Sequence, residues 1–400
     1  MELVNIERIQ AARKLLREVT RVTPMEHARD LRRLQGGPVY LKCENLQRTG
    51  SFKIRGAYTR IHGLTEEERA RGVVAASAGN HAQGVALAAS LLGAKSTVFM
   101  PLRAPLPKIA ATRGYGADVH LRGVLLEETL AEAVAFGERT GAVFIHPFDH
   151  VDVIAGQGTV GLEILDQVPG AKTVLVATGG GGLVGGVACA VKALHPDTRV
   201  VGVQAERAAA YIPSLAAGKP VRLEQTNTLA DGIAVGQPGE VSYAHVESMV
   251  DDVVTVTEES LTRAVLLCLE RRKLVVEPAG AATVAALLQH PGAFEPPVVA
   301  VLSGGNVDPM LLLQIIQHGM TAGGRYLRLR LRVPDQPGAL VGVLSCVSEL
   351  GANVLDVEHS RISGALALGE ADIVLALETR GPEHCLEVET ALSSAGYVIV

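Results

Sequence analysis

The chain has 400 residues, of which 48% are hydrophobic and 20% charged, and its formal net charge is -5. This length predicts two or three domains of a globular protein, and the acidic balance gives no electrostatic footprint for nucleic-acid binding. No apolar run reaches the roughly 18 residues that a membrane span needs. Five scattered cysteines without C-x-x-C spacing favour reduced thiols in a cytoplasmic protein over a disulfide framework or a zinc site.

Short Val-rich runs alternate with longer Ala- and Leu-rich runs over most of the chain. Strands that are apolar on both faces and separated by helices are typical of buried parallel sheets with βαβ crossovers. The strands form two sets, around residues 48–149 and 152–317, so we expect two α/β lobes. The predicted strands are Val39–Lys42, Val73–Ser77, Thr97–Met100, Val143–His146, Thr173–Thr178, Val200–Gln204, Val253–Val256 and Val298–Ser303, with helices that include Asn80–Leu92, Leu183–Leu194, Glu259–Glu270 and Ala279–His290.

The character of the chain changes after a glycine-containing break at Gln317–Arg325. Residues Tyr326–Val333 alternate apolar and charged side chains, which predicts a strand with one solvated face. A helix, two strands, a second helix and a final strand follow, and the order β-α-β-β-α-β is the ferredoxin-like arrangement. We therefore predict a first domain over 1–318, with a small lobe of about 48–150 inserted in a large lobe, a linker over 319–325, and an α+β domain over 326–400.

Lys53 is the first candidate functional residue. Ser51 is a plausible N-cap, which would place Lys53 in the first turn of a helix. There the helix dipole and burial both disfavour the protonated amine, and a lysine with a lowered pKa is the nucleophile that condenses with an aldehyde cofactor. From these residues alone, a surface lysine beside a helix start remains the alternative.

The run Gly179–Gly182, followed by Leu183, lies directly between a predicted strand and a predicted helix. Consecutive glycines allow backbone N–H groups to converge on a phosphate at the helix N-terminus. A tight turn is the simpler interpretation. A dinucleotide is a further one, because Gly180, Gly182 and Gly185 satisfy G-x-G-x-x-G and Glu206 ends the next strand. The pattern therefore leaves an NAD-linked dehydrogenase open.

Two further strand ends carry polar or small residues. The stretch Ser77–His81 could hold a substrate carboxylate through small residues and backbone amides, and Asn80 in it could bond a ring hydroxyl. Ser303 begins the stretch SGGN at the end of another strand, where open α/β sheets place ligands. Ordinary turns or helix caps would explain either stretch alone. No P-loop, H-E-x-x-H motif, G-x-S-x-G elbow or cluster of metal ligands is present.

Eight motifs occur in order: KCENLQRTGSFKIRGA, ASAGNHAQG, ATRGYGADV, IAGQGTVGLEI, ATGGGGL, TLADGIAVG, VVEPAGA and LSGGNVD. Together they resemble the fold-type II pyridoxal-phosphate enzymes, and within them the threonine ammonia-lyases. The resemblance implies a two-lobed catalytic domain with pyridoxal 5'-phosphate between the lobes. It also implies deamination of threonine to 2-oxobutanoate and ammonia, and of serine to pyruvate. A serine-preferring dehydratase is the alternative within the same family.

The resemblance also implies roles for particular residues. Lys53 would bind the cofactor covalently and act as the base. The other cofactor contacts would be Phe52 beside the ring, Asn80 at the 3'-oxygen, Ser303 at the pyridine nitrogen, and Gly179, Gly180, Gly181, Gly182 and Leu183 around the phosphate. The substrate carboxylate would be surrounded by Ser77, Gly79, Asn80 and His81, mainly through backbone amides.

Two departures from relatives refine the expected function. Related serine racemases carry a second serine directly after Ser77, and here that position is Ala78. Metal-dependent relatives carry acidic ligands after the strand VVGVQ, where this chain has Gln204 and Ala210. The departures imply a dehydratase that lacks the second proton carrier of a racemase, and no metal site is expected.

The tail resembles a single ACT-type regulatory domain through RVPDQPGALVGVLSCVSELGANVLDVEHSR. That resemblance implies an amino-acid effector, for which isoleucine is the hypothesis, and a homo-oligomer, either a dimer or a tetramer. An oligomerisation module that binds nothing is the alternative, as is a chain that acts chiefly as a sensor.

Overall fold

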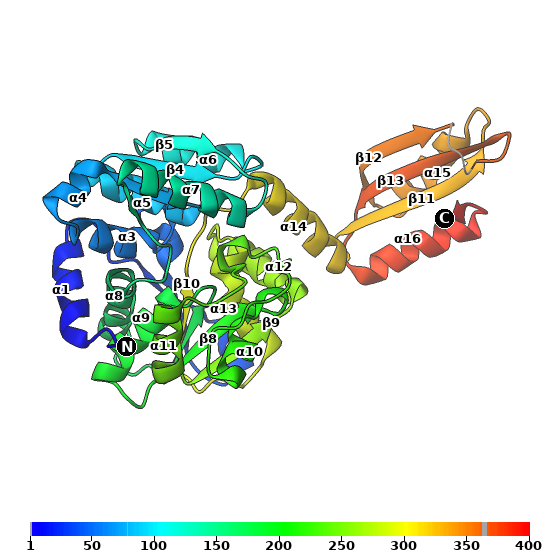
Figure 1. Ribbon diagram of the computed structural model, residues 1–400. Coiled ribbons are helices and arrows are strands. Elements are labelled where there is room, and N and C mark those ends of the chain that lie inside the picture. Colours follow the sequence, from blue (N-terminus) through cyan, green and yellow to red (C-terminus); the bar gives the residue numbers. More distant parts are fainter. Residues whose placement is uncertain (1, 78, 362–365) are drawn as a thin grey trace. The chain divides into compact units, whose positions relative to one another are not determined.

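The computed structural model describes residues 2–77, 79–361 and 366–400, which form two compact units, 1–308 and 309–400. Figure 1 labels the elements of both units. The first unit contains two sheets. The larger has the strand order β1-β2-β10-β7-β8-β9, and every neighbouring pair is parallel except β1 with β2. Its strands are β1 (Met25–His27), β2 (Val39–Cys43), β7 (Thr173–Ala177), β8 (Arg199–Ala205), β9 (Asp252–Val256) and β10 (Val298–Leu302).

The smaller sheet has the order β5-β4-β3-β6 and is parallel throughout. Its strands are β3 (Val73–Ala76), β4 (Ser96–Met100), β5 (Asp118–Leu121) and β6 (Val143–Phe144). The chain therefore contributes β2 to the large sheet, builds the small sheet, and returns to the large sheet. The prediction of two α/β lobes with parallel sheets is confirmed, although the short strand β1 and β5 were not predicted.

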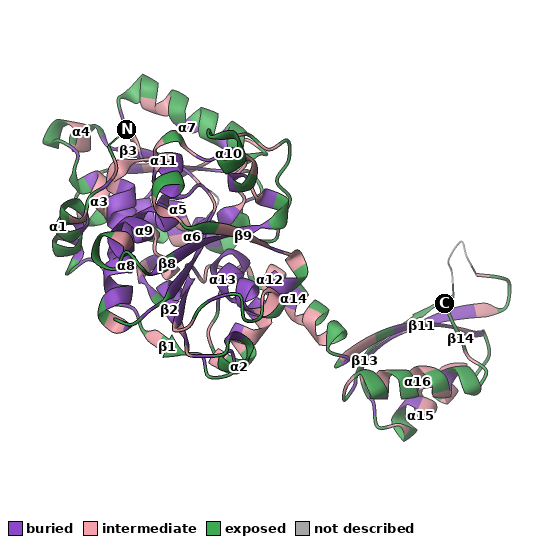
Figure 2. Ribbon diagram, turned by 90° about the horizontal axis from the view of Figure 1, so that it is seen from below, coloured by how far each residue is buried: buried purple, intermediate pink, exposed green. Residues whose placement is uncertain are grey.

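Helices cover both sheets and bury the central strands, which Figure 2 shows in purple. In β3, β7 and β10 every residue is buried, because helices on both faces leave no side for polar residues. The helices of the first unit are α1 (Ile6–Leu16), α2 (Arg32–Gln35), α3 (Lys53–His62), α4 (Glu66–Arg71), α5 (Asn80–Leu91), α6 (Leu106–Gly114), α7 (Leu126–Thr140), α8 (Val151–Gln167), α9 (Gly182–Leu194), α10 (Tyr211–Ala217), α11 (Glu240–Met249), α12 (Glu258–Leu267) and α13 (Pro278–Gln289).

Glycines allow α8 and α9 to pack backbone against backbone. A Cβ on Gly186 would lie 2.3 Å from the carbonyl oxygen of Ile154, so any other residue would force the two helices apart. This close packing fixes the axis of α9, whose N-terminus begins at the four-glycine turn.

The second unit begins with α14 (Pro309–Ala322) and contains a four-stranded antiparallel sheet of order β12-β13-β11-β14. Its other elements are β11 (Tyr326–Pro334), α15 (Ala339–Glu349), β12 (Asn353–Ser360), β13 (Glu370–Glu378), α16 (Pro382–Ser394) and β14 (Val398–Ile399). The order β-α-β-β-α-β matches the prediction for 326–400. The helix α14 occupies residues 319–322 of the predicted linker, since its apolar periodicity continues up to the glycine pair.

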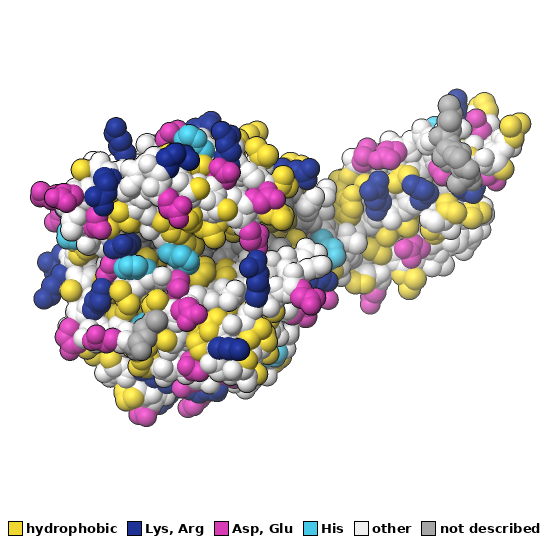
Figure 3. All heavy atoms as spheres, viewed as in Figure 1, with side chains coloured by type: hydrophobic (Ala, Val, Ile, Leu, Met, Phe, Trp, Pro, Cys, Tyr) yellow, Lys and Arg dark blue, Asp and Glu magenta, His cyan; other side chains and the backbone are white. Residues whose placement is uncertain are grey.

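The sheet of the second unit has one apolar and one charged face. Leu329, Leu331 and Val333 of β11 are buried, whereas Arg328 before them and Arg330 among them are exposed. This alternation is the pattern of a sheet covered by helices on one side only. Within the described ranges of both units, no helix is long and apolar enough to cross a membrane. On the face seen in Figure 3, basic and acidic side chains are interspersed.

Candidate active site

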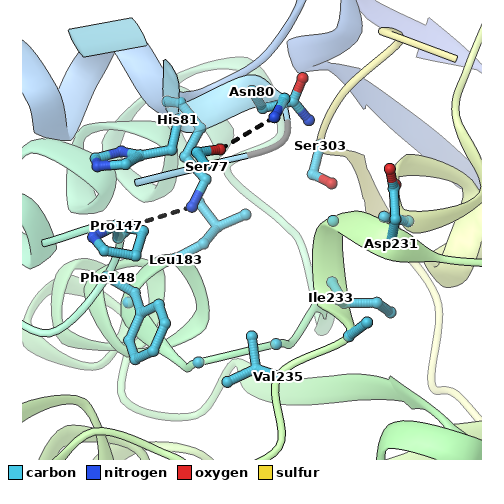
Figure 4. A pocket seen from close by; sticks show the side chains of 18 of the residues that line it. Ser77, Asn80, His81, Pro147, Phe148, Leu183, Asp231, Ile233, Val235 and Ser303 are labelled. Atoms are coloured by element: carbon cyan, nitrogen blue, oxygen red, sulfur yellow. Dashed lines mark hydrogen bonds between the residues drawn. The ribbon is translucent and has the colours of Figure 1, made fainter. Parts of the chain in front are cut away.

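One cavity of the first unit lies where the strands of both sheets end. Ala76 at the end of β3, Ala177 at the end of β7 and Ser303 after β10 all line it, and the carboxyl ends of parallel strands are where α/β folds bind ligands. Among its lining residues are all those that the sequence predicted and the structure describes: Phe52, Lys53, Ser77, Gly79, Asn80, His81, Gly179, Gly180, Gly181, Gly182, Leu183 and Ser303. Figure 4 shows several of them around the cavity. Ala78 lies outside the described residues.

Lys53 is the first residue of α3, as predicted, but Ser51 does not cap the helix. The N-cap position is Phe52, and Ser51 is extended, with φ -164° and ψ 164°. Ser51 instead bridges to Gly304, and its buried Oγ has no hydrogen-bond partner among the described residues. The prediction of a Ser51 cap was wrong, because the backbone of Ser51 pairs with Gly304 after β10 and its Oγ accepts no hydrogen bond from an N–H group of α3.

The Lys53 amine points at polar and aromatic groups of the cavity wall. Its Nζ donates to the carbonyl oxygen of Pro147 at 2.9 Å and lies 5.1 Å from the centre of the Phe52 ring. Burial lowers its pKa to about 8, and the negative charge of Glu277 opposes that shift. At pH 7 about a tenth of this amine is therefore neutral, against about one in three thousand for an ordinary lysine. The amine is poised to act as a nucleophile and base.

The four-glycine turn leads from β7 into α9 with no room for side chains. Gly181 has φ +97°, and its Cβ would lie 1.9 Å from the Tyr211 hydroxyl. A Cβ on Gly180 would lie 2.4 Å from the Phe148 ring. The first N–H groups of a helix have no partner within it and carry its positive dipole. A cradle of this kind fits a phosphate group.

His81 and Gly79 refine the expected contacts to a carboxylate. The Nε2–H of His81 donates to the carbonyl of Ile145 at 2.8 Å, and burial lowers the pKa of this ring to about 3. The imidazole is therefore neutral and turned away, which leaves the backbone of His81 for binding. The N–H of Gly79 donates to Ser77 Oγ at 3.1 Å, so a bound carboxylate would have to replace that bond.

Sequence reasoning did not single out three charged residues of the cavity wall. Glu277 is 2% exposed, and burial together with the nearby charge of Asp231 raises its pKa to about 7, against an opposing effect of Lys108. The Lys108 amine in turn pairs with Asp231 at 2.8 Å. Glu277 and Asp231 lie within VVEPAGA and TLADGIAVG, two of the motifs that carried the resemblance, so those motifs were the signal that could have found them.

Gln204 performs a structural task at the position where a metal ligand was considered. Its side-chain Nε2 donates to the carbonyls of Thr178 and Ala208 at 3.2 and 3.4 Å, and its Oε1 accepts from the N–H of Tyr211 at 2.9 Å. The amide thus ties the segment Ala208–Tyr211 to the residue before the glycine turn. Ala210 is buried in the same segment. In the described part of the chain, no group of three or more His, Cys, Asp or Glu side chains could hold a metal ion.

Comparison with known proteins identifies the cofactor chemistry. Residues 16–304 match the model of a family described as pyridoxal-phosphate dependent enzyme. The chain is 47% identical to the L-threonine ammonia-lyase of Thermotoga maritima, over 99% of each chain. Among solved structures, it resembles the T.th. threonine deaminase with 44% identity and a TM-score of 0.72, over 76% of this chain and 99% of that one. Maize serine racemase is similar with 35% identity and a TM-score of 0.75, over 80% and 99%.

These matches decide between the two interpretations of the glycine run. The spacing Gly180, Gly182, Gly185 does follow a strand, and Glu206 does follow β8. The family match nevertheless spans this whole region with a different cofactor, so the alternative of an NAD-linked dehydrogenase is wrong.

Proposed function

Because the chain belongs to the family of pyridoxal-phosphate dependent enzymes, we propose that it deaminates L-threonine to 2-oxobutanoate and ammonia, and L-serine to pyruvate and ammonia. One observation carries the proposal. A half-buried lysine with a lowered pKa and a glycine cradle at a helix N-terminus line the same cavity. The likeness to L-threonine ammonia-lyases over nearly the full chain supports threonine as the substrate.

The residues on the cavity wall fit the shape and charge of the cofactor. The N–H groups of Gly179–Leu183 would hold its phosphate, the Lys53 amine its aldehyde carbon, and the Ser303 hydroxyl its ring nitrogen. Asn80 would donate to the ring oxygen, and Phe52 would flank the ring. When bound, pyridoxal phosphate supplies an electron sink for the α-carbon of an amino acid.

The chain's own groups account for the proton transfers. The neutral Lys53 amine takes the proton from the α-carbon of threonine as general base. The β-hydroxyl takes up one proton and leaves as water, so the elimination neither gains nor loses protons overall. One water is later consumed, so the balance is one threonine to one 2-oxobutanoate and one ammonia. Ser77, Gly79, Asn80 and His81 would hold the carboxylate through backbone groups while this happens.

A keto-acid assay on threonine and serine tests the proposed function. The purified protein should show a visible absorption band with the cofactor bound, and Lys53→Ala should abolish both the band and turnover. A colourless, inactive protein would remove the proposal. The ratio of kcat/KM for the two substrates separates a threonine enzyme from a serine-preferring one, and D-serine formed from L-serine would indicate a racemase instead.

We propose that the second unit is an ACT-type regulatory domain that binds an amino acid such as isoleucine. Its β-α-β-β-α-β order and antiparallel sheet support this assignment. Isoleucine titrated during turnover should change the rate or the substrate cooperativity, and an unchanged rate and cooperativity at every concentration would remove the effector.

A homo-oligomer, a dimer or tetramer, is part of the same proposal and is testable by light scattering. A cytoplasmic location is supported by the five free cysteines.

A further inference from the structure

Asn306 occupies a junction between the strand end that carries Ser303 and two segments of the cavity wall. It lies three residues after Ser303, in the stretch SGGN. Its side-chain Nδ2 donates two hydrogen bonds, to the carbonyl oxygen of Thr49 at 2.6 Å and to Oδ1 of Asn80 at 2.7 Å. These partners lie 257 and 226 residues away along the chain.

The hydrogen bonds of this junction leave the Asn80 amide one orientation. The Thr49 carbonyl can only accept, so Asn306 must present its NH₂ group there. The same NH₂ group then faces the oxygen of Asn80, whose own NH₂ group is turned to the other side and donates to the Glu277 carboxylate. By donating to the oxygen of the Asn80 amide, Asn306 directs the NH₂ group of Asn80 toward Glu277. On the side that faces Glu277, Asn80 therefore presents a donor and not an acceptor.

The same side chain restrains the backbone that leads to Lys53. Thr49 has φ +62°, which is strained for a β-branched residue. The following Gly50 has φ +69°, and a Cβ there would lie 2.5 Å from Oδ1 of Asn306. The hydrogen bond from Asn306 to Thr49 holds this strained turn four residues before Lys53.

We propose that Asn306 is a positioning residue for the cofactor, acting mainly through Asn80. It orients the Asn80 amide as a hydrogen-bond donor to the anionic ring oxygen, and it holds the turn from which the Lys53 helix begins. The inference rests on the proposed use of the cavity. The inference goes beyond the proposed function because Asn306 does not line the cavity and was not among the predicted site residues.

A double-mutant cycle on the full-length protein tests this role. The variants are Asn306→Ala, Asn80→Ala and both together, each loaded with pyridoxal phosphate. Two quantities are measured: the pH midpoint of the visible band of the lysine-bound cofactor, and the dissociation constant of the cofactor. A hydrogen bond to a charged group predicts that Asn306→Ala shifts the midpoint by about one pH unit and weakens cofactor binding roughly tenfold. In the Asn80→Ala background the same change should have little further effect, because its target is absent.

Asn5→Ala is the matched control for lost stability. Asn5 caps α1 by accepting a bond from the N–H of Arg8, and removing such a cap typically costs about 1 kcal/mol. This control should lower the melting temperature and leave the midpoint unchanged. If Asn306→Ala fails to fold, Asn306→Ser, which keeps a small donor, takes its place in the cycle, and failure of both would make Asn306 a purely structural residue.

The outcomes separate this inference from the proposed function. An undiminished shift in the Asn80→Ala background, or a loss of stability with an unmoved midpoint, overturns the positioning role. A wild-type protein that shows the band but does not deaminate threonine would instead remove the proposed substrate, and the spectroscopic cycle would still decide the role of Asn306.

Discussion

Two groups of charged residues in the first unit, a buried ionic cluster and a pair that lines the cavity, have pKa values that are shifted in opposite senses. The ionic cluster consists of Lys42, Glu44, Arg55 and Glu163. Its two cations and two anions form salt bridges of 2.6 to 2.8 Å. Burial alone would raise the pKa of Glu44, yet the adjoining Arg55 guanidinium outweighs it and the pKa is lowered. The charged forms of Glu44 and Arg55 are therefore favoured.

The cavity pair, Lys53 and Glu277, is shifted toward the neutral forms. Burial lowers the pKa of Lys53 to about 8 and raises that of Glu277 to about 7. The Lys53 amine donates to a carbonyl oxygen and the Glu277 carboxylate accepts from the Asn80 amide, so neither group has a countercharge at hydrogen-bond distance among the residues that the structure describes. The charged forms are thus favoured where ions are paired, and the groups can exchange protons where they are not. Proton transfer belongs to the second arrangement.

The largest expected effect comes from breaking the ionic cluster. Arg55→Met leaves Glu44 and Glu163 buried without their main partner, which should destabilise the protein by about 3–5 kcal/mol. The measurement is the denaturant midpoint of the first unfolding transition at pH 7. Arg13→Met is the control, because Arg13 pairs with Asp166 at the surface, where their side chains are 47% and 54% exposed, and the expected loss is about 0–1 kcal/mol. Equal losses in the two variants would show that the ionic cluster contributes no more than a surface pair.

Replacing Glu277 by glutamine tests the cavity pair through the pH dependence of protein stability. A carboxyl group whose folded pKa is raised stabilises the fold below its unfolded pKa of 4.5, and loses that contribution as the pH rises through about 7. From pH 4.5 to 7 this group should therefore lower the stability of the cofactor-free wild type by on the order of 3 kcal/mol. Glu277→Gln should lack this slope, so its stability relative to wild type should rise between pH 5 and pH 8.

The control for this pH dependence is Glu66→Gln, at an exposed position in the first turn of α4. It should follow the wild-type profile over the same range. Parallel profiles for wild type and Glu277→Gln would mean that the pKa of this carboxyl group is the same in the folded and the unfolded chain, and that burial does not raise it.

The sequence predicted what is encoded locally. The glycine turn, Lys53 at the start of α3, and the alternation of β11 each depend on residues that are neighbours along the chain. The strand β5 was missed because its four residues, DVHL, form no apolar run between the flanking helices. Local pattern therefore predicts elements whose burial is uniform or regularly alternating.

Contacts between segments that are distant along the chain produce no local sequence pattern. Lys42 lies in a strand that was predicted, yet its partner Glu163 lies 121 residues away, and nothing near either residue indicates the pair. The bond between Asn80 and Glu277 joins residues 197 apart. The Ser51 cap failed for the same reason, because the pairing of Ser51 with Gly304 overrode a plausible local signal. The resemblance of the eight motifs to a known family indicated the site residues as a set, whereas each motif alone allowed several interpretations.

The smallest expected effect concerns the strained turn beside the cavity. Thr49 has φ +62°, and its buried Oγ1 has no hydrogen-bond partner among the described residues. Thr49→Gly removes the conformational strain and the unpartnered hydroxyl, so it should raise stability by about 1 kcal/mol. It should also lower kcat, because the turn that precedes Lys53 becomes free to move.

Lys273→Gly is the matched control for this change. Lys273 also has a positive φ, +60°, but it is exposed and does not line the cavity. The same relief of strain there should raise stability by a similar amount or less, since glycine also gains entropy in the unfolded chain, and kcat should stay at the wild-type value. Steady-state kinetics and denaturant unfolding on both variants make the comparison. If Thr49→Gly gains stability with unchanged kcat, the strain in this turn is incidental to catalysis. The ionic cluster and the cavity pair would then differ only in how their charges are paired.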